Sequence, residues 1–168
     1  MKRLLCLTIV FCCIFTLFGC TGKQDIPNGS IAVYYKRATP TYGTADSVIA
    51  ATYLEADGKE TDYPYLIDKY LNHTPEEDFL SIFPKGVQLE SFHLEGLTAK
   101  IVLSDHFADL TGMNLTVACT CLTKTLMEMT GCREVIISAK SMQLDGHNFI
   151  TLNQDSFLLL DDSTQNDL

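Results

Sequence analysis

Apolar and polar residues alternate along several short segments of the chain, which is the period of a half-buried β-strand. The clearest alternation runs through residues 87–94 and again through 97–104. Glu95 and Gly96 stand between these two segments and are turn formers, so together they predict a β-hairpin. The other segments whose composition predicts strands are 31–36, 47–55, 133–139 and, more weakly, 149–160.

A helical period marks one long segment, which begins at Met113 or Asn114. Gly131 is well placed to end that helix in a left-handed cap. The apolar residues that fall on one line of a helical wheel are Leu115, Ala118, Cys119, Leu122, Leu126 and Met129. This stripe is predicted to be buried, and the threonines and charged residues of the segment fall outside it.

A shorter helix is predicted at residues 62–72, with Pro64 near its start and Asp62 or Tyr63 near its cap. The run Thr74-Pro75-Glu76-Glu77 opens a further turn or short helix that extends to Ile82. Residues 38–46 and 105–112 are predicted to be loops.

This order of elements predicts an α+β fold in one small domain at residues 31–162. The simplest way to bury both helical stripes is a mixed sheet of three to five strands with the two main helices packed on one face. Residues 20–30 are polar and turn-prone and predict a flexible tether, and 163–168 are predicted to be a disordered tail.

The chain begins with a secretory pattern. Lys2 and Arg3 precede an apolar run, and Gly19 stands before Cys20. The run of about fifteen residues is short of the roughly twenty that a membrane-spanning helix needs. Residues 1–19 resemble a bacterial lipoprotein signal, which implies cleavage before Cys20 and a lipid on its thiol. Two acyl chains, palmitate among them, would then hold the protein on the extracytoplasmic face of the cell membrane.

Acidic residues outnumber basic ones, 21 against 12, which gives a formal net charge of −9. Loss of Lys2 and Arg3 with the signal would leave −11. This balance argues against nucleic acid as a partner and against lying flat on anionic lipid. The acids are spread along the chain, which predicts a solvated surface rather than a cation-binding patch.

Three of the seven cysteines lie beyond the signal and Cys20: Cys119, Cys121 and Cys132. Cys119 and Cys121 point about 200° apart on a helix, so a bridge between them is geometrically poor. We predict free thiols that behave as small apolar residues.

No constellation of residues predicts catalysis, a metal or a cofactor. The four histidines are His73, His93, His106 and His147. A metal between His93 and the pair Asp105-His106 is conceivable, but no recognised ligand spacing supports it, and surface histidines are the favoured reading. Ser104 lacks the Gly-x-Ser-x-Gly elbow of a nucleophile, and nothing selects a carboxylate pair. The prediction is a protein that is not an enzyme.

All seven tyrosines lie in the first half of the chain. Tyr34 and Tyr35 are adjacent in a predicted strand and must face opposite ways. Since tyrosine is frequent in interface hot spots, Tyr34, Tyr35 and Tyr53 are candidates for a protein interface. The alternative is that these rings lie at core edges with their hydroxyls in water.

Ordered motifs across residues 31–150 resemble the GerMN domain of sporulation and spore germination proteins. The segments that carry the resemblance are Ile82-Phe83-Pro84-Lys85-Gly86-Val87, Glu95-Gly96-Leu97, 99–107, 122–126, 131–135 and Asp145-Gly146. The resemblance implies a fold akin to ring-building motifs, no chemistry, and docking onto other envelope proteins, with a ring or channel assembly among the partners to be considered.

The predicted function is therefore a lipid-anchored, extracytoplasmic protein-binding module. The alternative is a solute- or peptidoglycan-binding lipoprotein or an accessory of a cell-wall hydrolase. That alternative requires a concave pocket with convergent polar groups.

Overall fold

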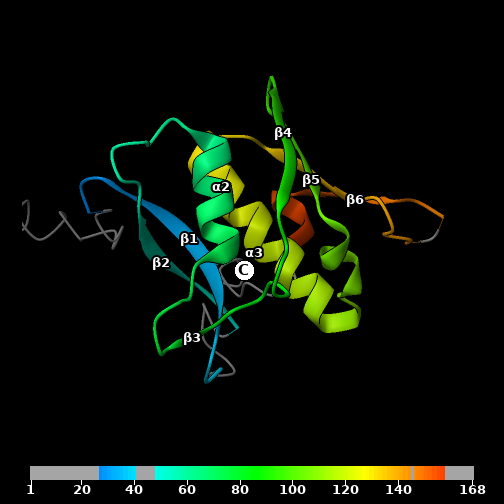
Figure 1. Cartoon of the computed structure of the whole chain (residues 1–168), viewed down its shortest axis with the longest axis horizontal. Helices are drawn as coiled ribbons and strands as arrows, with labels where there is room; N and C mark the ends of the chain where they lie inside the picture. Colours follow the sequence, from blue (N-terminus) through cyan, green and yellow to red (C-terminus); the bar gives the residue numbers. More distant parts are fainter. Residues whose placement is uncertain (1–26, 41–47, 145, 158–168) are drawn as a thin grey trace, which may run out of the picture.

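A long helix lies between two β-sheets in the computed structural model, which describes residues 27–40, 48–144 and 146–157 (Figure 1). The signal at residues 1–19, Cys20, most of the tether and the tail at 163–168 lie outside the described residues. None of the described helices has both the length and the hydropathy to cross a bilayer.

The first sheet has three antiparallel strands in the order β2-β1-β3, whose bounds are Ile49–Glu55, Ser30–Arg37 and Phe79–Leu80. Burial in β1 follows the period of two, since Val33 and Tyr35 have no exposed surface while their neighbours do. β3 pairs only with Lys36 and Arg37, so no other described strand pairs with the rest of that edge of β1.

The second sheet has four strands in the order β4-β5-β6-β7, with bounds Leu89–Glu95, Thr98–Leu103, Glu134–Ala139 and Phe149–Asn153. β4 and β5 form the predicted hairpin, and β6 and β7 are also antiparallel. β5 and β6 are parallel. A parallel pair needs a long crossover, which the long helix supplies.

The helices are α2, Tyr63–Asn72, and α3, Gly112–Thr130. Asp62 caps α2, because its side chain accepts a hydrogen bond from the Tyr65 N–H at 3.2 Å. Gly131 ends α3 with φ 71°, and its N–H donates to the Met127 C=O at 2.8 Å. Both caps confirm the predictions made from the sequence.

The α+β fold class is confirmed, and the expected mixed sheet is the four-stranded one. The first two strands belong instead to a separate sheet, and the helices do not share one face. α2 contacts β4, whereas α3 contacts β1 on one side and β6 and β7 on the other. Of the turn or short helix expected at residues 74–82, the structure has the turn, and Phe79 and Leu80 then pair with β1. The segment expected as a loop after β5 contains the 3-10 helix Asp105–Asp109, and another spans Gln154–Phe157.

Because α3 is buried on both sides, a threonine hydroxyl of this helix lies in the core. Thr123 is fully buried, and its Oγ1 finds no hydrogen-bond partner among the described residues. We expect Thr123→Val, which keeps the shape and removes the unpaired hydroxyl, to raise the free energy of unfolding by about 1 kcal/mol. Urea denaturation of the variant checks this, with Thr120→Val as the control. Thr120 Oγ1 donates to the Thr116 C=O at 2.8 Å, so its loss should bring no such gain.

Candidate functional site

Tyr34 joins β1 to both helices through its main chain. Its N–H donates to Thr125 Oγ1 of α3 at 3.0 Å, and its C=O accepts from the Tyr70 hydroxyl of α2 at 2.5 Å. The Lys124 Nζ lies 5.3 Å from the centre of the Tyr34 ring. These contacts satisfy main-chain groups on the edge of β1 that no strand covers. Tyr34 is half-buried, so part of its ring remains accessible.

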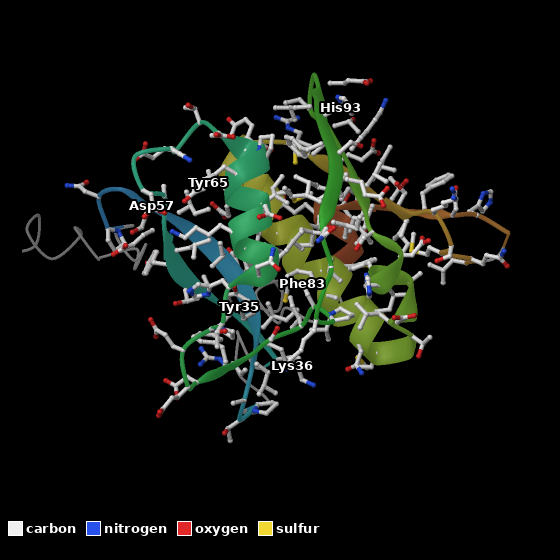
Figure 2. All side chains as sticks on the ribbon, in the orientation of Figure 1. Tyr35, Lys36, Asp57, Tyr65, Phe83 and His93 are labelled. Carbon is white, nitrogen blue, oxygen red and sulfur yellow. The ribbon has the colours of Figure 1, made fainter. Side chains whose placement is uncertain are left out.

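Tyr35 lies in the core and has no exposed surface (Figure 2). Its ring meets the Tyr70 ring edge-on at 5.2 Å, and its hydroxyl donates to the Tyr70 C=O at 3.4 Å. His73 Nδ1 lies 3.3 Å from the same hydroxyl. Burial raises the pKa of Tyr35. A partner cannot reach this side chain in the folded domain. The prediction of Tyr35 as an interface residue is therefore wrong. Tyr53 is half-buried on β2, and the interface role of Tyr34 and Tyr53 stays a prediction.

The Tyr70 hydroxyl is a direct test of this cluster. Tyr70→Phe removes the donor and leaves the Tyr34 C=O without that partner. The expected result is a loss of about 1–3 kcal/mol in the free energy of unfolding, since an unsatisfied buried acceptor keeps its desolvation penalty. Urea denaturation measures it, and Tyr63→Phe, at a half-buried ring at the start of α2, is the matched control. Equal midpoints for the two variants would contradict the assigned role.

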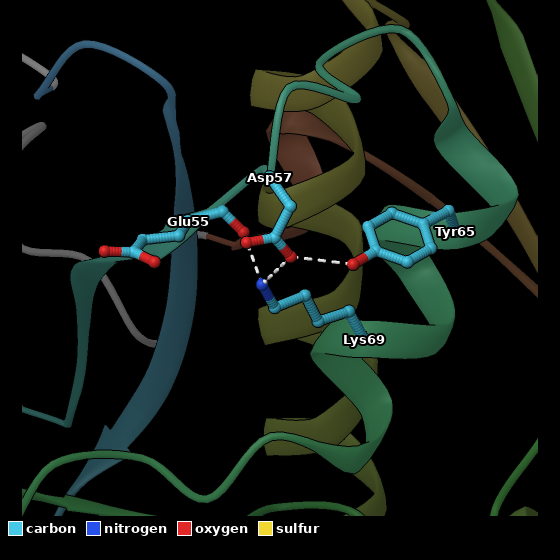
Figure 3. A network of polar contacts seen from close by, with 4 residues as sticks. All are labelled: Glu55, Asp57, Tyr65 and Lys69. Atoms are coloured by element: carbon cyan, nitrogen blue, oxygen red, sulfur yellow. Dashed lines mark hydrogen bonds and ion pairs between the residues drawn. The ribbon is translucent and has the colours of Figure 1, made fainter.

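A second polar cluster joins the end of β2 to α2 (Figure 3). Lys69 Nζ lies 2.5 Å from Asp57 Oδ2, and the Tyr65 hydroxyl donates to the same oxygen at 2.7 Å. Lys69 also donates to the Glu55 C=O at 2.8 Å. The hydrogen bond from Lys69, followed by that from Tyr65, lowers the pKa of Asp57. These groups bond to one another at the surface, so the cluster holds the β2–α2 turn in place rather than presenting reactive groups.

The serine and the aspartate that were candidates for catalysis accept hydrogen bonds from the main chain of neighbouring segments. Ser104 Oγ accepts from the Gln88 N–H at 3.0 Å, and Asp105 Oδ1 accepts from the Ser141 N–H at 2.8 Å. That bond from Ser141 lowers the pKa of Asp105. His93 lies on the protruding β4–β5 hairpin (Figure 2). Among the described residues, no three His, Cys, Asp or Glu side chains gather closely enough to hold a metal ion.

The three cysteines are free and buried, as predicted: Cys119, Cys121 and Cys132. Desolvation raises the pKa of the Cys119 thiol to about 12 and that of the Cys121 thiol further still. A thiol with a raised pKa is a poor nucleophile at neutral pH. Both cysteines of α3 therefore serve as small packing residues.

A groove lies between α3 and the last strand of the second sheet. It has a volume of about 490 Å³, and its apolar lining residues are Leu115, Cys119, Leu144, Phe149, Ile150 and Leu152. Thr116, Thr120, His147 and Ser156 add polar groups. This groove could not be predicted from the sequence, because β7 was only a weak strand in the pattern. Its one signal was the apolar character of Ile150 and Leu152.

No protein-family model matches the sequence, and no curated protein matches it. The fold is similar to the first GerMN domain of the sporulation protein GerM from Bacillus subtilis. The TM-score is 0.57 at 14% identity, over 75% of this chain and 98% of that one. A putative lipoprotein from Clostridium perfringens gives 0.48 at 17% identity, over 79% and 91% of the two chains. The tandem GerMN domains of GerM give 0.49 at 16%, over 68% and 39%. The likeness to the first GerMN domain shows that the chain has a GerMN-like fold, which the ordered motifs had predicted.

Proposed function

We propose that this chain is a lipid-anchored module on the extracytoplasmic face of the cell membrane that binds another envelope protein. The observation that carries the proposal is a lipoprotein-like Leu17-Phe18-Gly19-Cys20 in front of a domain with a GerMN-like fold. Since the similar domain belongs to a sporulation protein, we propose a role in spore formation or germination.

Binding rather than catalysis is favoured by how the polar side chains are used. Ser104, Asp105 and Asp57 each bond to a neighbouring loop or helix. The groove between α3 and β7 is mostly apolar along its walls. Apolar walls suit the side chains of a protein segment, whereas a sugar or peptidoglycan fragment needs several convergent polar groups, of which this groove offers Thr116, Thr120, His147 and Ser156. The solute-binding alternative is therefore second, and titration with muropeptides tests it directly.

The lipid anchor is tested by Cys20→Ser, which removes the thiol that would carry the lipid. Cells are grown with an alkyne analogue of palmitate, and the protein is examined for label and for its share in the membrane fraction. We expect the wild-type chain to be labelled and membrane-bound, and Cys20→Ser to lose the label and leave the uncleaved signal in place. Cys13→Ser, which changes a thiol inside the signal, is the matched control and should behave as the wild type. Label that survives Cys20→Ser would contradict the anchor.

Protein binding is tested separately, by crosslinking in cells followed by purification from detergent-solubilised membranes during growth and sporulation. The expected result is a stoichiometric envelope protein on the wild-type chain and less of it on Cys20→Ser. Absence of any stoichiometric partner at every stage would contradict the binding role.

A further inference from the structure

β7 is the last strand of its sheet within residues 27–40, 48–144 and 146–157, so one of its edges has no neighbouring strand in this part of the chain. Its five residues, Phe149–Asn153, include no charge and no proline, and its register with β6 is unbroken. Edge strands are commonly protected by charges, prolines or bulges. β4, at the other end of the sheet, carries two such devices, since it contains glutamates and a shift in register. β7 is thus the unprotected edge of the four-stranded sheet.

The main chain of β7 offers hydrogen bonds on that open side. The Asn153 N–H donates to Ser156 Oγ at 3.1 Å instead of to β6. In an antiparallel strand, residues direct their N–H and C=O groups alternately toward one neighbour and then the other. Phe149 and Thr151 alternate with Asn153 along the strand, at positions four and two residues before it. We therefore expect their N–H and C=O groups also to point away from β6. An added strand would pair with these groups.

The groove lies beneath the position that such a strand would occupy. Ile150 and Leu152 pair in register with Ile137 and Val135, so all four face the inside of the sheet. Ile137 and Val135 have no exposed surface, but Ile150 and Leu152 are only half-buried because the sheet ends there. An extra strand beyond β7 would direct alternate side chains into the groove toward Leu115 of α3. The edge and the groove together therefore match an extended peptide.

The charges of the groove and of the whole chain indicate which kind of peptide would bind. The groove lining contains no Asp, Glu, Lys or Arg and is mostly apolar, so the inserted side chains should be apolar. The chain as a whole has a formal net charge of −9, and Asp155 follows directly beyond β7. Such a surface attracts a basic partner at long range. The complementary segment alternates apolar residues with lysine or arginine.

We propose that β7 binds an extended basic segment of a partner protein as an additional strand, with its alternate apolar side chains in the groove between β7 and α3. This inference rests on the proposed function, because it names the surface and the kind of segment through which the module would bind. Main-chain pairing supplies affinity in such complexes, and the pockets for alternate side chains supply specificity.

The probe is the peptide acetyl-Lys-Val-Lys-Val-Lys-Val-Lys-amide, added to the full chain labelled with ¹⁵N in detergent micelles. The expected result is that hydrogen exchange at the Phe149 and Thr151 amides slows by about tenfold or more at saturation. Two further probes are N-methylated at every valine or at every lysine. Since only every second residue of an added strand pairs with β7, one methylated form should bind and the other should not. Equal binding by both forms, or no slowing of exchange, would overturn the proposal.

Variants of β7 give an independent readout. Thr151→Pro removes an outward N–H, and an edge strand tolerates proline when that N–H faces solvent. Thr151→Val keeps the N–H and is the matched control. We expect probe affinity to fall about tenfold in Thr151→Pro and to be unchanged in Thr151→Val, with equal urea midpoints. Loss of affinity in both variants, or in neither, would overturn strand addition.

Two further outcomes separate this inference from the proposed function. If the probe binds only to a chain that ends at Phe157, residues 158–168 compete for the groove and the proposal of an external segment is overturned. If Thr151→Pro loses the probe but still purifies with its envelope partner, the partner binds elsewhere. This inference then fails, while the proposed function stands. Failure of the Cys20 labelling affects the proposed function alone, since the probe experiment needs no lipid.

Discussion

Raising the pH above about 9 is expected to lower the free energy of unfolding steeply. Four groups in the core are stable only in their neutral forms: the hydroxyls of Tyr35 and Tyr70 and the thiols of Cys119 and Cys121. Desolvation is the first cause in each case, and it raises the pKa of Cys119 from 9.0 to about 12. The pKa values of Tyr70, Tyr35 and Cys121 are also raised.

The direction in which the free energy of unfolding changes with pH follows from proton binding. Below pH 9 all four groups are neutral in the folded and the unfolded chain, so their contribution to stability is fully present. Above the ordinary pKa of 9.0 for a thiol and 10.0 for a tyrosine, the unfolded chain loses protons that the folded chain keeps. Each such group then costs up to about 1.4 kcal/mol per pH unit. The two thiols act first, and the two tyrosines add to them above pH 10.

Urea denaturation at pH 7, 8, 9, 10 and 11 measures this fall. The double variant Cys119→Ala, Cys121→Ala is the control, because without the thiols the decline should begin about one pH unit later, where the tyrosines titrate. A midpoint that stays constant from pH 8 to pH 11 would show that these groups ionise as easily inside the domain as outside it, and would refute their assignment to a dry core.

Local signals in the sequence located most of the elements. The turn at Glu95-Gly96 lies in the hairpin as predicted, with Gly96 at φ 60°. Gly131 and Asp62 ended and began their helices as expected. These features depend on a few neighbouring residues. The alternation of residues 97–104 likewise predicts a half-buried strand from neighbouring residues alone. Such signals do not depend on what packs against the element.

The second buried side of α3 could not be predicted by the same means. Cys121, Thr123 and Thr125 fall off the apolar stripe on a helical wheel, and two of the three are polar. Thr125 is nevertheless buried because it meets the open edge of β1, where its Oγ1 accepts from the Tyr34 N–H. That contact joins residues 91 positions apart, so no short window of sequence contains it.

β3 and the groove were missed for the same reason. Pro75 and the two glutamates after it have the composition of a helix start, yet the Phe79 N–H donates to the Glu76 C=O in a turn, and β3 then pairs with the end of β1. The groove exists because α3 and β7 meet only partly, which depends on the placement of whole elements. Tyr35 looked like an interface candidate for a related reason, since alternation in a strand does not tell which face is the inner one.

Leu122→Ala is expected to be among the most damaging single substitutions in the domain. Leu122 lies in the middle of α3, has no exposed surface, and belongs to the apolar cluster that joins the two sheets. Removing its side chain leaves a cavity that the two sheets cannot both close, so the expected loss is about 2–5 kcal/mol in the free energy of unfolding. A domain of this size has a total of about 5–15 kcal/mol, so the variant should be partly unfolded at moderate urea concentrations.

Leu97→Ala is the matched control, because it makes the same chemical change at a side chain that is 53% exposed at the hairpin tip. Its expected effect is within about 0.5 kcal/mol. Far-UV circular dichroism in urea measures both variants, and the slope of the transition shows whether the unfolding remains cooperative. A difference of less than about 1 kcal/mol between the two variants would contradict the burial of Leu122. A large difference shows that Leu122 is enclosed in the core, where both the apolar stripe of the sequence and the structure place it.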